Sequence, residues 1–263
     1  MSAQVGASAG EAQGEAWREQ GLVGSYLERR QILLPLIDIQ EELLGRLLGR
    51  LQRPVARFLD LGCGDGAMAE LVIERFPHAS AMLVDFSEPM LARVAARMDR
   101  CAPGRWQSMR ADLRRADWSR ALPAGPFDAV VSGMAIHHLP SERKRALYAE
   151  VFALLAPGGL FLNMDYVSVQ GPLSGLFDEE MHAKAAAHAQ RSNRQGHEHA
   201  VRGGHGGHGE DAVVDDLDSD EDQPDSLPDQ LRWLGEAGFA EAEVHFKWAE
   251  AAIFGAVRPG GGA

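Results

Sequence analysis

Hydrophobic residues recur at two different spacings between residues 55 and 165, and this predicts strands alternating with helices. Five short runs are almost wholly apolar, as buried strands are, and stretches with apolar residues every three or four positions follow several of them. The expected strands are 58–62, 81–85, 106–110, 127–133 and 160–164, and the expected helices are 67–76, 88–100 and 141–155. Wholly apolar strands are typical of parallel sheets covered by helices on both faces, so we predict a doubly wound α/β fold.

The remaining segments differ from this core in composition. Residues 1–16 are rich in Ala, Gly and Gln, which favours a flexible tail, whereas 17–52 has helical spacing interrupted at Pro35 and predicts an N-terminal helical cap. After a core domain at 53–170, residues 171–228 form a His-, Gly- and acid-rich insertion that we expect to be disordered at least over 194–223. A helix near 229–235 and a strand pair, 243–248 and 251–257, are expected within 229–263 and complete a mostly parallel seven-stranded sheet as an edge hairpin.

The negative charge is concentrated in that insertion. The formal net charge of the chain is -12, but ten of its 38 acidic residues lie between Glu210 and Asp229, where there is no Lys or Arg. The rest is close to neutral and has no basic stripe of the kind that nucleic acids select, so a nucleic-acid partner is not expected. Two cysteines, no visible signal peptide and no apolar run of membrane-spanning length predict a cytoplasmic protein without a membrane partner.

The sharpest chemical signal is the run DLGCGDG, Asp60 to Gly66, between the first expected strand and the first helix. Glycines there allow a left-handed backbone and let a ligand approach closely. Doubly wound folds hold nucleotides at this turn. The alternative is a glycine-rich turn that binds nothing.

Asp60 indicates which type of nucleotide this turn would bind. Gly62, Gly64 and Ala67 loosely satisfy a dinucleotide fingerprint, but the Asp60 carboxylate would repel a pyrophosphate and suits a ligand that carries an ammonium group. A P-loop is excluded because no Gly-Lys-Ser/Thr follows the glycines.

A second candidate element is VDFSEPML, Val84 to Leu91. Asp85 ends the second expected strand, where an acid can accept hydrogen bonds from both ribose hydroxyls of an adenosine ligand. Phe86 and Met90 are placed to flank the purine. Alternatively, Asp85 only caps the following helix.

These motifs resemble those of the class I S-adenosylmethionine-dependent methyltransferases, which have a seven-stranded Rossmann-like fold. Three further motifs match in order: RADL, residues 110–113; FDAVVSGMAIHHL, 127–139; and LLAPGGLFLNMD, 154–165. The resemblance covers about 55–165 and implies S-adenosylmethionine as cofactor. It says nothing specific about the methyl acceptor, because one fold serves many substrates.

The resemblance also implies roles for individual residues. Asp60 would lie near the methionine ammonium, Asp85 at the ribose and Gly133 near the sulfonium. The full predicted cofactor set is Asp60, Gly62, Cys63, Gly64, Asp85, Phe86, Met90, Asp112, Leu113 and Gly133, together with Tyr26 and Arg29 on the N-terminal helical segment. Asp112 and Leu113 would contact the adenine, and a solvated helix face is the alternative explanation for Arg29.

His138 and His137 are the candidate catalytic residues. They follow the fourth expected strand, at the sheet edge where substrates bind, and either could remove a proton from an acceptor that must lose one. The alternative is that both only pack locally. The histidines at 197, 199, 205 and 208 can chelate metals, but a glycine-rich linker supplies no fixed geometry, so we predict no metal site.

The sequence therefore predicts a methyltransferase that acts on a small molecule by in-line displacement. The alternatives are a relative that forms carboxy-S-adenosylmethionine or takes part in tRNA modification, and a non-catalytic S-adenosylmethionine-binding protein. A homodimer is compatible with the sequence.

Overall fold

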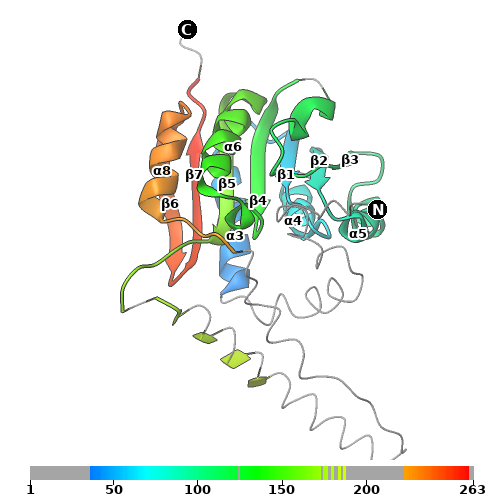
Figure 1. Cartoon of the computed structure of the whole chain (residues 1–263). Helices are drawn as coiled ribbons and strands as arrows, with labels where there is room; N and C mark the ends of the chain where they lie inside the picture. The colour runs from blue at the N-terminus through cyan, green and yellow to red at the C-terminus, as the bar shows by residue number, and fades with distance from the viewer. Residues whose placement is uncertain are drawn as a thin grey trace, which may run out of the picture.

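The computed structural model describes residues 36–123, 125–172, 174–176, 179–180, 183–184, 186–187 and 222–260. Its centre is a seven-stranded sheet in the order β3-β2-β1-β4-β5-β7-β6 (Figure 1). The strands are β1 Arg57–Leu61, β2 Ser80–Asp85, β3 Trp106–Arg110, β4 Phe127–Gly133, β5 Leu155–Tyr166, β6 Ala240–Trp248 and β7 Ala251–Val257. This confirms the predicted doubly wound α/β fold.

The direction of the strands sets where a ligand can bind. β1 to β5 pair in parallel, whereas β7 is antiparallel to both β5 and β6. The strand order reverses between β1 and β4, and in open α/β sheets ligands bind beyond the carboxyl ends of the strands at such a reversal. The edge hairpin β6–β7 is formed as predicted.

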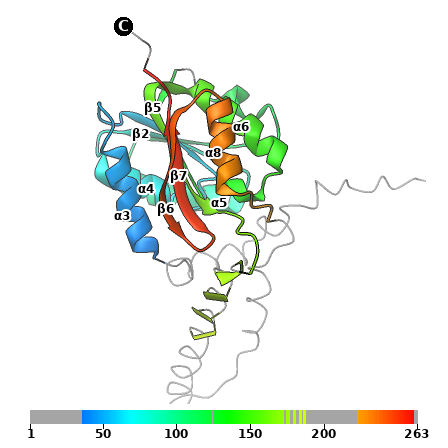
Figure 2. The ribbon, with the colours of Figure 1, turned by 90° about the vertical axis from the view of Figure 1, so that its left-hand side faces the viewer.

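Helices cover both faces of the sheet. α3 Ile37–Leu48 and α4 Ala67–Arg75 lie on one face, and α6 Ser141–Leu154 and α8 Leu227–Glu236 lie on the other (Figure 2). α5 Glu88–Cys101 packs into the same apolar cluster as α3 and α4. Two short 3-10 helices, η2 Trp118–Ala121 and η3 Ile136–His138, follow β3 and β4. Each face buries its own apolar cluster, so burial of apolar area on both sides of the strands stabilises the sheet.

Sequence signals explain several element boundaries. The Ser87 hydroxyl caps α5 by accepting a hydrogen bond from the Met90 N–H, and Pro89 lies in the first turn. Ser87 is thus the N-cap residue of α5. β5 begins earlier than predicted, at Leu155, because the Pro157-Gly158-Gly159 segment is taken into the strand as an irregularity in its pairing with β4.

The predicted insertion also ends earlier than expected. We expected disorder as far as residue 223 and a helix near 229, but α8 already begins at Leu227 with Ser226 as its N-cap. The Gln223 N–H donates to the His137 carbonyl, 3.0 Å away, which fixes the chain just before the helix. The expectations for 1–16 and for the first predicted helix of the cap lie outside the described residues, as does most of 171–221.

Candidate active site

The turn after β1 is tightly anchored to β2. The N–H groups of Gly62 and Cys63 both donate to the Val84 carbonyl, at 2.8 and 3.0 Å. Gly62 and Gly64 adopt positive φ angles of 65° and 53°, in the left-handed region that glycine reaches without steric cost. The predicted glycine-rich turn is therefore present between β1 and α4.

The two glycines face different surroundings. A Cβ added at Gly62 would lie 2.3 Å from the Ala135 Cβ, so this glycine lets the segment after β4 pack against the turn. A Cβ added at Gly64 would meet no atom within 4 Å. Gly64 thus borders open space, as a residue that contacts a bound ligand would. Gly133 makes room for Met68, whose Cε would lie 2.6 Å from an added Cβ.

Asp85 links this turn to the end of β2. Its Oδ2 accepts a hydrogen bond from the Gly64 N–H and its Oδ1 accepts one from the Ser87 N–H, each at 2.8 Å. Burial raises the pKa of Asp85, and the backbone donors oppose this shift by stabilising the carboxylate. Ser87, not Asp85, supplies the side-chain cap of α5, so helix capping does not explain the acid at this position.

The turn lies in a negative field. Asp60 is 1% exposed on β1, and Asp60, Asp85 and Asp65 add to the effect of burial in raising the pKa of the Cys63 thiol well above its usual value. Asp65 pairs with Arg97 at 2.5 Å. A cationic ligand group is the natural complement of such a turn, whereas a pyrophosphate would be repelled.

A cleft of about 430 Å³ lies beyond the ends of β2 and β3. Phe86 and Asp112 line it, as the predicted adenine contacts require, together with Trp118 and several arginines. Leu113 is buried beside it, in the same apolar cluster as Trp118. The Asp112 carboxylate is already held by the Arg114 guanidinium, at 2.9 and 3.0 Å, so its contact with an adenine stays a prediction.

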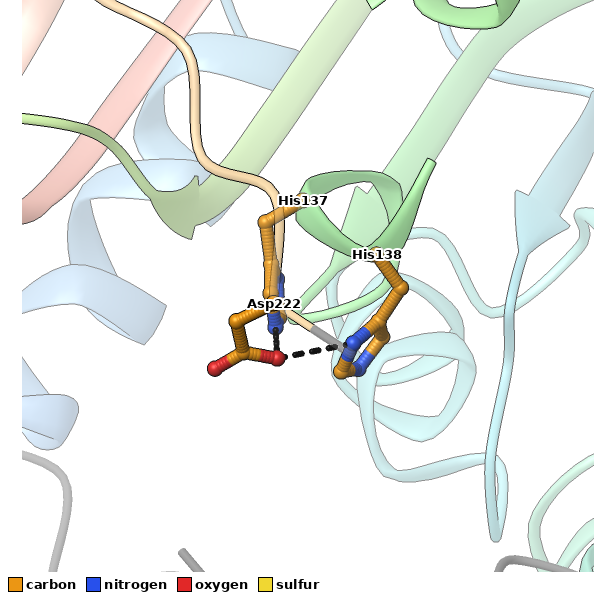
Figure 3. A group of neighbouring side chains, drawn as sticks. All are labelled: His137, His138 and Asp222. Carbon is orange, nitrogen blue, oxygen red and sulfur yellow. Dashed lines mark ion pairs between the residues drawn. The ribbon is translucent and has the colours of Figure 1, made fainter. Parts of the chain in front are cut away.

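His137 and His138 lie in η3, directly after β4. His137 is buried and its Nδ1 is 2.5 Å from the Asp165 Oδ1, while its Nε2 is 3.5 Å from the Asp222 Oδ1 (Figure 3). The Nδ1 of His138 is 2.9 Å from the same Asp222 oxygen. Burial alone would lower the pKa of His137, but the two carboxylates outweigh it and raise the pKa to about 9.

This arrangement changes the prediction for the two histidines. With its pKa raised to about 9, His137 already carries a proton near neutral pH and cannot accept another, so the geometry favours His138, which is 28% exposed, as the base. The alternative of local packing fits His137 better than His138.

Asp222 was missed as a site residue. It lies within the acidic insertion, and no local pattern distinguishes it from its acidic neighbours. Tyr26 and Arg29, predicted at the cofactor, lie outside the described residues.

Comparisons with known proteins agree with this geometry. Residues 58–159 match the model of a family described as "Methyltransferase domain". This segment holds the glycine turn, Asp85, Asp112 and the two histidines. Over these residues the chain is similar to methyltransferase domains.

Relatives of the methyltransferase domain match over part of their length. An uncharacterized methyltransferase of Mycobacterium tuberculosis is 38% identical over 110 residues, 42% of this chain and 50% of the relative. A trans-aconitate 2-methyltransferase of Streptomyces avermitilis is 36% identical over 152 residues, 57% of this chain and 51% of the relative. The chain thus spans about half the length of these curated relatives.

A solved structure confirms the fold of the methyltransferase domain. Human N-acetylserotonin methyltransferase, solved in complex with S-adenosylmethionine, has a TM-score of 0.57 at 14% identity and covers 96% of this chain and 60% of its own. Among the described residues, no helix combines the length and apolar character needed to cross a bilayer.

The residues present fit S-adenosylmethionine. Gly64 leaves open space beside the turn, and Asp60 and Asp85 supply negative charge for the ammonium and hydrogen-bond acceptors for the ribose. Phe86 and Asp112 border the cleft where the purine would lie. These residues are the ones that would hold the cofactor.

Proposed function

We propose that this chain transfers a methyl group from S-adenosylmethionine to a small-molecule acceptor by in-line displacement. The observation that carries the proposal is the Asp85 carboxylate, which is buried and bonded to the Gly64 N–H at the open side of the turn. The near-neutral charge outside the acidic insertion supports a small acceptor over a nucleic acid. A cytoplasmic location is supported by Cys63 and Cys101, which are both free thiols.

The reaction needs positioning more than acid or base catalysis. Bound S-adenosylmethionine supplies a methyl group that its positive sulfur has already activated. Asp60, Asp85 and the glycine turn would hold the donor, and η3 would border the acceptor because Ala135 packs directly on Gly62. Holding the two reactants in line contributes most of the rate, and His138 would accept a proton where the acceptor must lose one.

Replacing Asp85 with asparagine is expected to weaken S-adenosylmethionine binding about 10- to 100-fold. Hydrogen bonds to a charged group contribute about 1.5–3 kcal/mol, which corresponds to this change in affinity. Asparagine also places an amide donor against one of the two backbone N–H groups that now donate hydrogen bonds to Asp85. Affinity is also expected to fall as the pH is lowered through the raised pKa of Asp85. Titration calorimetry measures both effects.

The control for this experiment is Asp99→Asn, which changes an exposed acid bonded to the Trp106 ring N–H, outside the proposed site. We expect it to bind the cofactor like the unmodified chain. Equal affinity in Asp85→Asn and Asp99→Asn would contradict the assignment of Asp85 to the ribose.

Incubation of a metabolite extract with the protein and isotopically methyl-labelled S-adenosylmethionine tests the reaction itself. We expect a labelled small molecule by mass spectrometry. Cofactor binding without any labelled product, in extracts and in RNA alike, would favour the alternative of a non-catalytic binding protein. Label in RNA would favour the tRNA-related alternative, and a carboxylated cofactor in the products would favour the carboxy-S-adenosylmethionine alternative.

A further inference from the structure

Three ligating side chains converge at the end of β4. His137 and His138 come from η3, and Asp222 comes from the segment that leads into α8 (Figure 3). The Nε2 or Nδ1 atoms of the histidines and a carboxylate oxygen of Asp222 all lie within 4.8 Å of one another. We propose that these three residues bind one divalent transition-metal ion, with Zn²⁺ as the best match to the donor set.

The distances suit a four-coordinate ion. Zn–N and Zn–O bonds are about 2.0–2.2 Å, which places two ligands of a tetrahedral ion roughly 3.3–3.5 Å apart. The Asp222 oxygen is 3.5 Å from the His137 Nε2 and 2.9 Å from the His138 Nδ1. Small side-chain rotations of Asp222 and His138, which are 26% and 28% exposed, would therefore complete the geometry.

A second layer of contacts fixes the orientation of His137. Asp165 accepts from both the His137 ring Nδ1 and its backbone N–H, at 2.5 and 3.0 Å, and Asn163 in turn donates to Asp165. The Nε2 is thereby directed at Asp222. Metal-binding histidines have this arrangement, in which the second ring nitrogen donates to a carboxylate that sets the tautomer and the ring plane.

Asp222 is held in place by contacts that do not involve the imidazole rings. The neighbouring Gln223 N–H donates to the His137 carbonyl. The ammonium of Lys144, which is fully buried, donates to the Gln223 carbonyl and pairs with Asp225 at 2.6 Å. The backbone beside the carboxylate is therefore anchored to η3 and α6, and the site is preorganised across two segments that are far apart in the sequence.

The position of the ion would matter for the acceptor. Three protein ligands leave one position open on a tetrahedral ion, and an oxygen or nitrogen donor of the acceptor could occupy it. Metal binding itself does not depend on the proposed methyl transfer, whereas this role in acceptor binding does. The histidines would then act as ligands in place of the base role proposed for His138, and an acceptor oxygen bound to the ion would have a lowered pKa and release its proton to water.

The test uses the full chain with the six histidines of the insertion replaced by asparagine, so that they cannot bind metal. These residues are His182, His188, His197, His199, His205 and His208. Calorimetry with Zn²⁺ is expected to give one bound ion, and Co²⁺ is expected to give the intense visible absorption of a four-coordinate site. Either Asp222→Asn or His138→Asn, added to this background, should weaken Zn²⁺ binding at least 10-fold. His78→Asn, which removes an exposed histidine between α4 and β2, is the matched control and should bind Zn²⁺ unchanged.

Several results would overturn the site. These are no Zn²⁺ bound at micromolar concentration on this background, a weak six-coordinate Co²⁺ spectrum, or equal affinity in the Asp222→Asn and His78→Asn chains. Circular dichroism of the metal-free variants shows whether they are folded. If Asp222→Asn is unfolded, the Zn²⁺ affinity of His138→Asn tests the site in its place. Calorimetry with S-adenosylmethionine on the same proteins separates the two proposals, because the metal site can stand or fail while the cofactor still binds.

Discussion

Replacing Asp165 with alanine is expected to lower the free energy of unfolding by about 3–5 kcal/mol, the usual cost of removing one partner of a buried ion pair. Asp165 is 2% exposed and His137 is 4% exposed, so water cannot replace the lost carboxylate. The change also removes the acceptor of the His137 backbone N–H and of the Asn163 amide. Urea unfolding of the metal-free protein at neutral pH measures the effect.

The dependence of this effect on pH has a definite sign. The pKa of His137 is raised from 6.5 to about 9, so its pairing stabilises the fold fully below 6.5 and this contribution is lost as the pH rises to about 9. The pKa of Asp165 is lowered from 3.8, because His137 and the donors to the carboxylate outweigh burial, and its contribution is lost in acid. The difference between the unmodified chain and Asp165→Ala should therefore be largest between about pH 4 and 6.5.

Two controls accompany this prediction. Asp165→Asn keeps the size of the side chain and one acceptor oxygen, so we expect a smaller loss. Asp117→Ala removes an exposed partner of Arg115 and should leave the free energy of unfolding nearly unchanged, because water screens an exposed ion pair. Equal losses of unfolding free energy in Asp165→Ala and Asp117→Ala would contradict the buried pair. A difference between the unmodified chain and Asp165→Ala that grows above pH 7 would also contradict it.

The parts of the fold that could be predicted from the sequence depend on local patterns. Apolar runs reveal strands such as β4 whatever lies beside them, and Ser87 followed by Pro89 marks the start of α5. The start of β5 could not be predicted in this way. Its irregular pairing with β4 is a property of two strands together, and Pro157-Gly158-Gly159 is typical of a turn when considered alone.

The residues of the candidate site differ in the same way, because local patterns reveal some of them and not others. Asp85 is the last residue of β2, at the position expected from the motif, and its hydrogen bond with Gly64 agrees with that expectation. Asp222 is one acid among many in its segment. It differs from the others because the next residue, Gln223, is hydrogen-bonded to His137 and to Lys144. A contact between residues more than 80 positions apart leaves no trace in local composition, which explains why the carboxylate beside the histidines was not foreseen.

The two glycines of the turn are expected to respond differently to the same substitution. Gly62 has a positive φ of 65°, and an alanine in this conformation lowers the free energy of unfolding by about 1–2 kcal/mol. It also places a Cβ 2.3 Å from that of Ala135, and overpacking of this kind costs roughly 1–3 kcal/mol more. Gly64→Ala has only the first cost, because its Cβ would meet no atom within 4 Å.

Cofactor binding should rank the two variants in the opposite order to stability. The Cβ of Gly64→Ala enters the space beside the Asp85-bonded N–H, where S-adenosylmethionine would lie, so we expect at least a 10-fold loss of affinity in a chain that loses less stability than Gly62→Ala. In Gly62→Ala the added Cβ points at Ala135 in the segment after β4. The midpoint temperature of thermal unfolding should therefore fall further in Gly62→Ala than in Gly64→Ala. Tight binding by Gly64→Ala would place the donor elsewhere, and normal stability in Gly62→Ala would mean that Ala135 can move away at little cost. The pair of measurements thereby separates the glycine that shapes the turn from the glycine that borders the ligand.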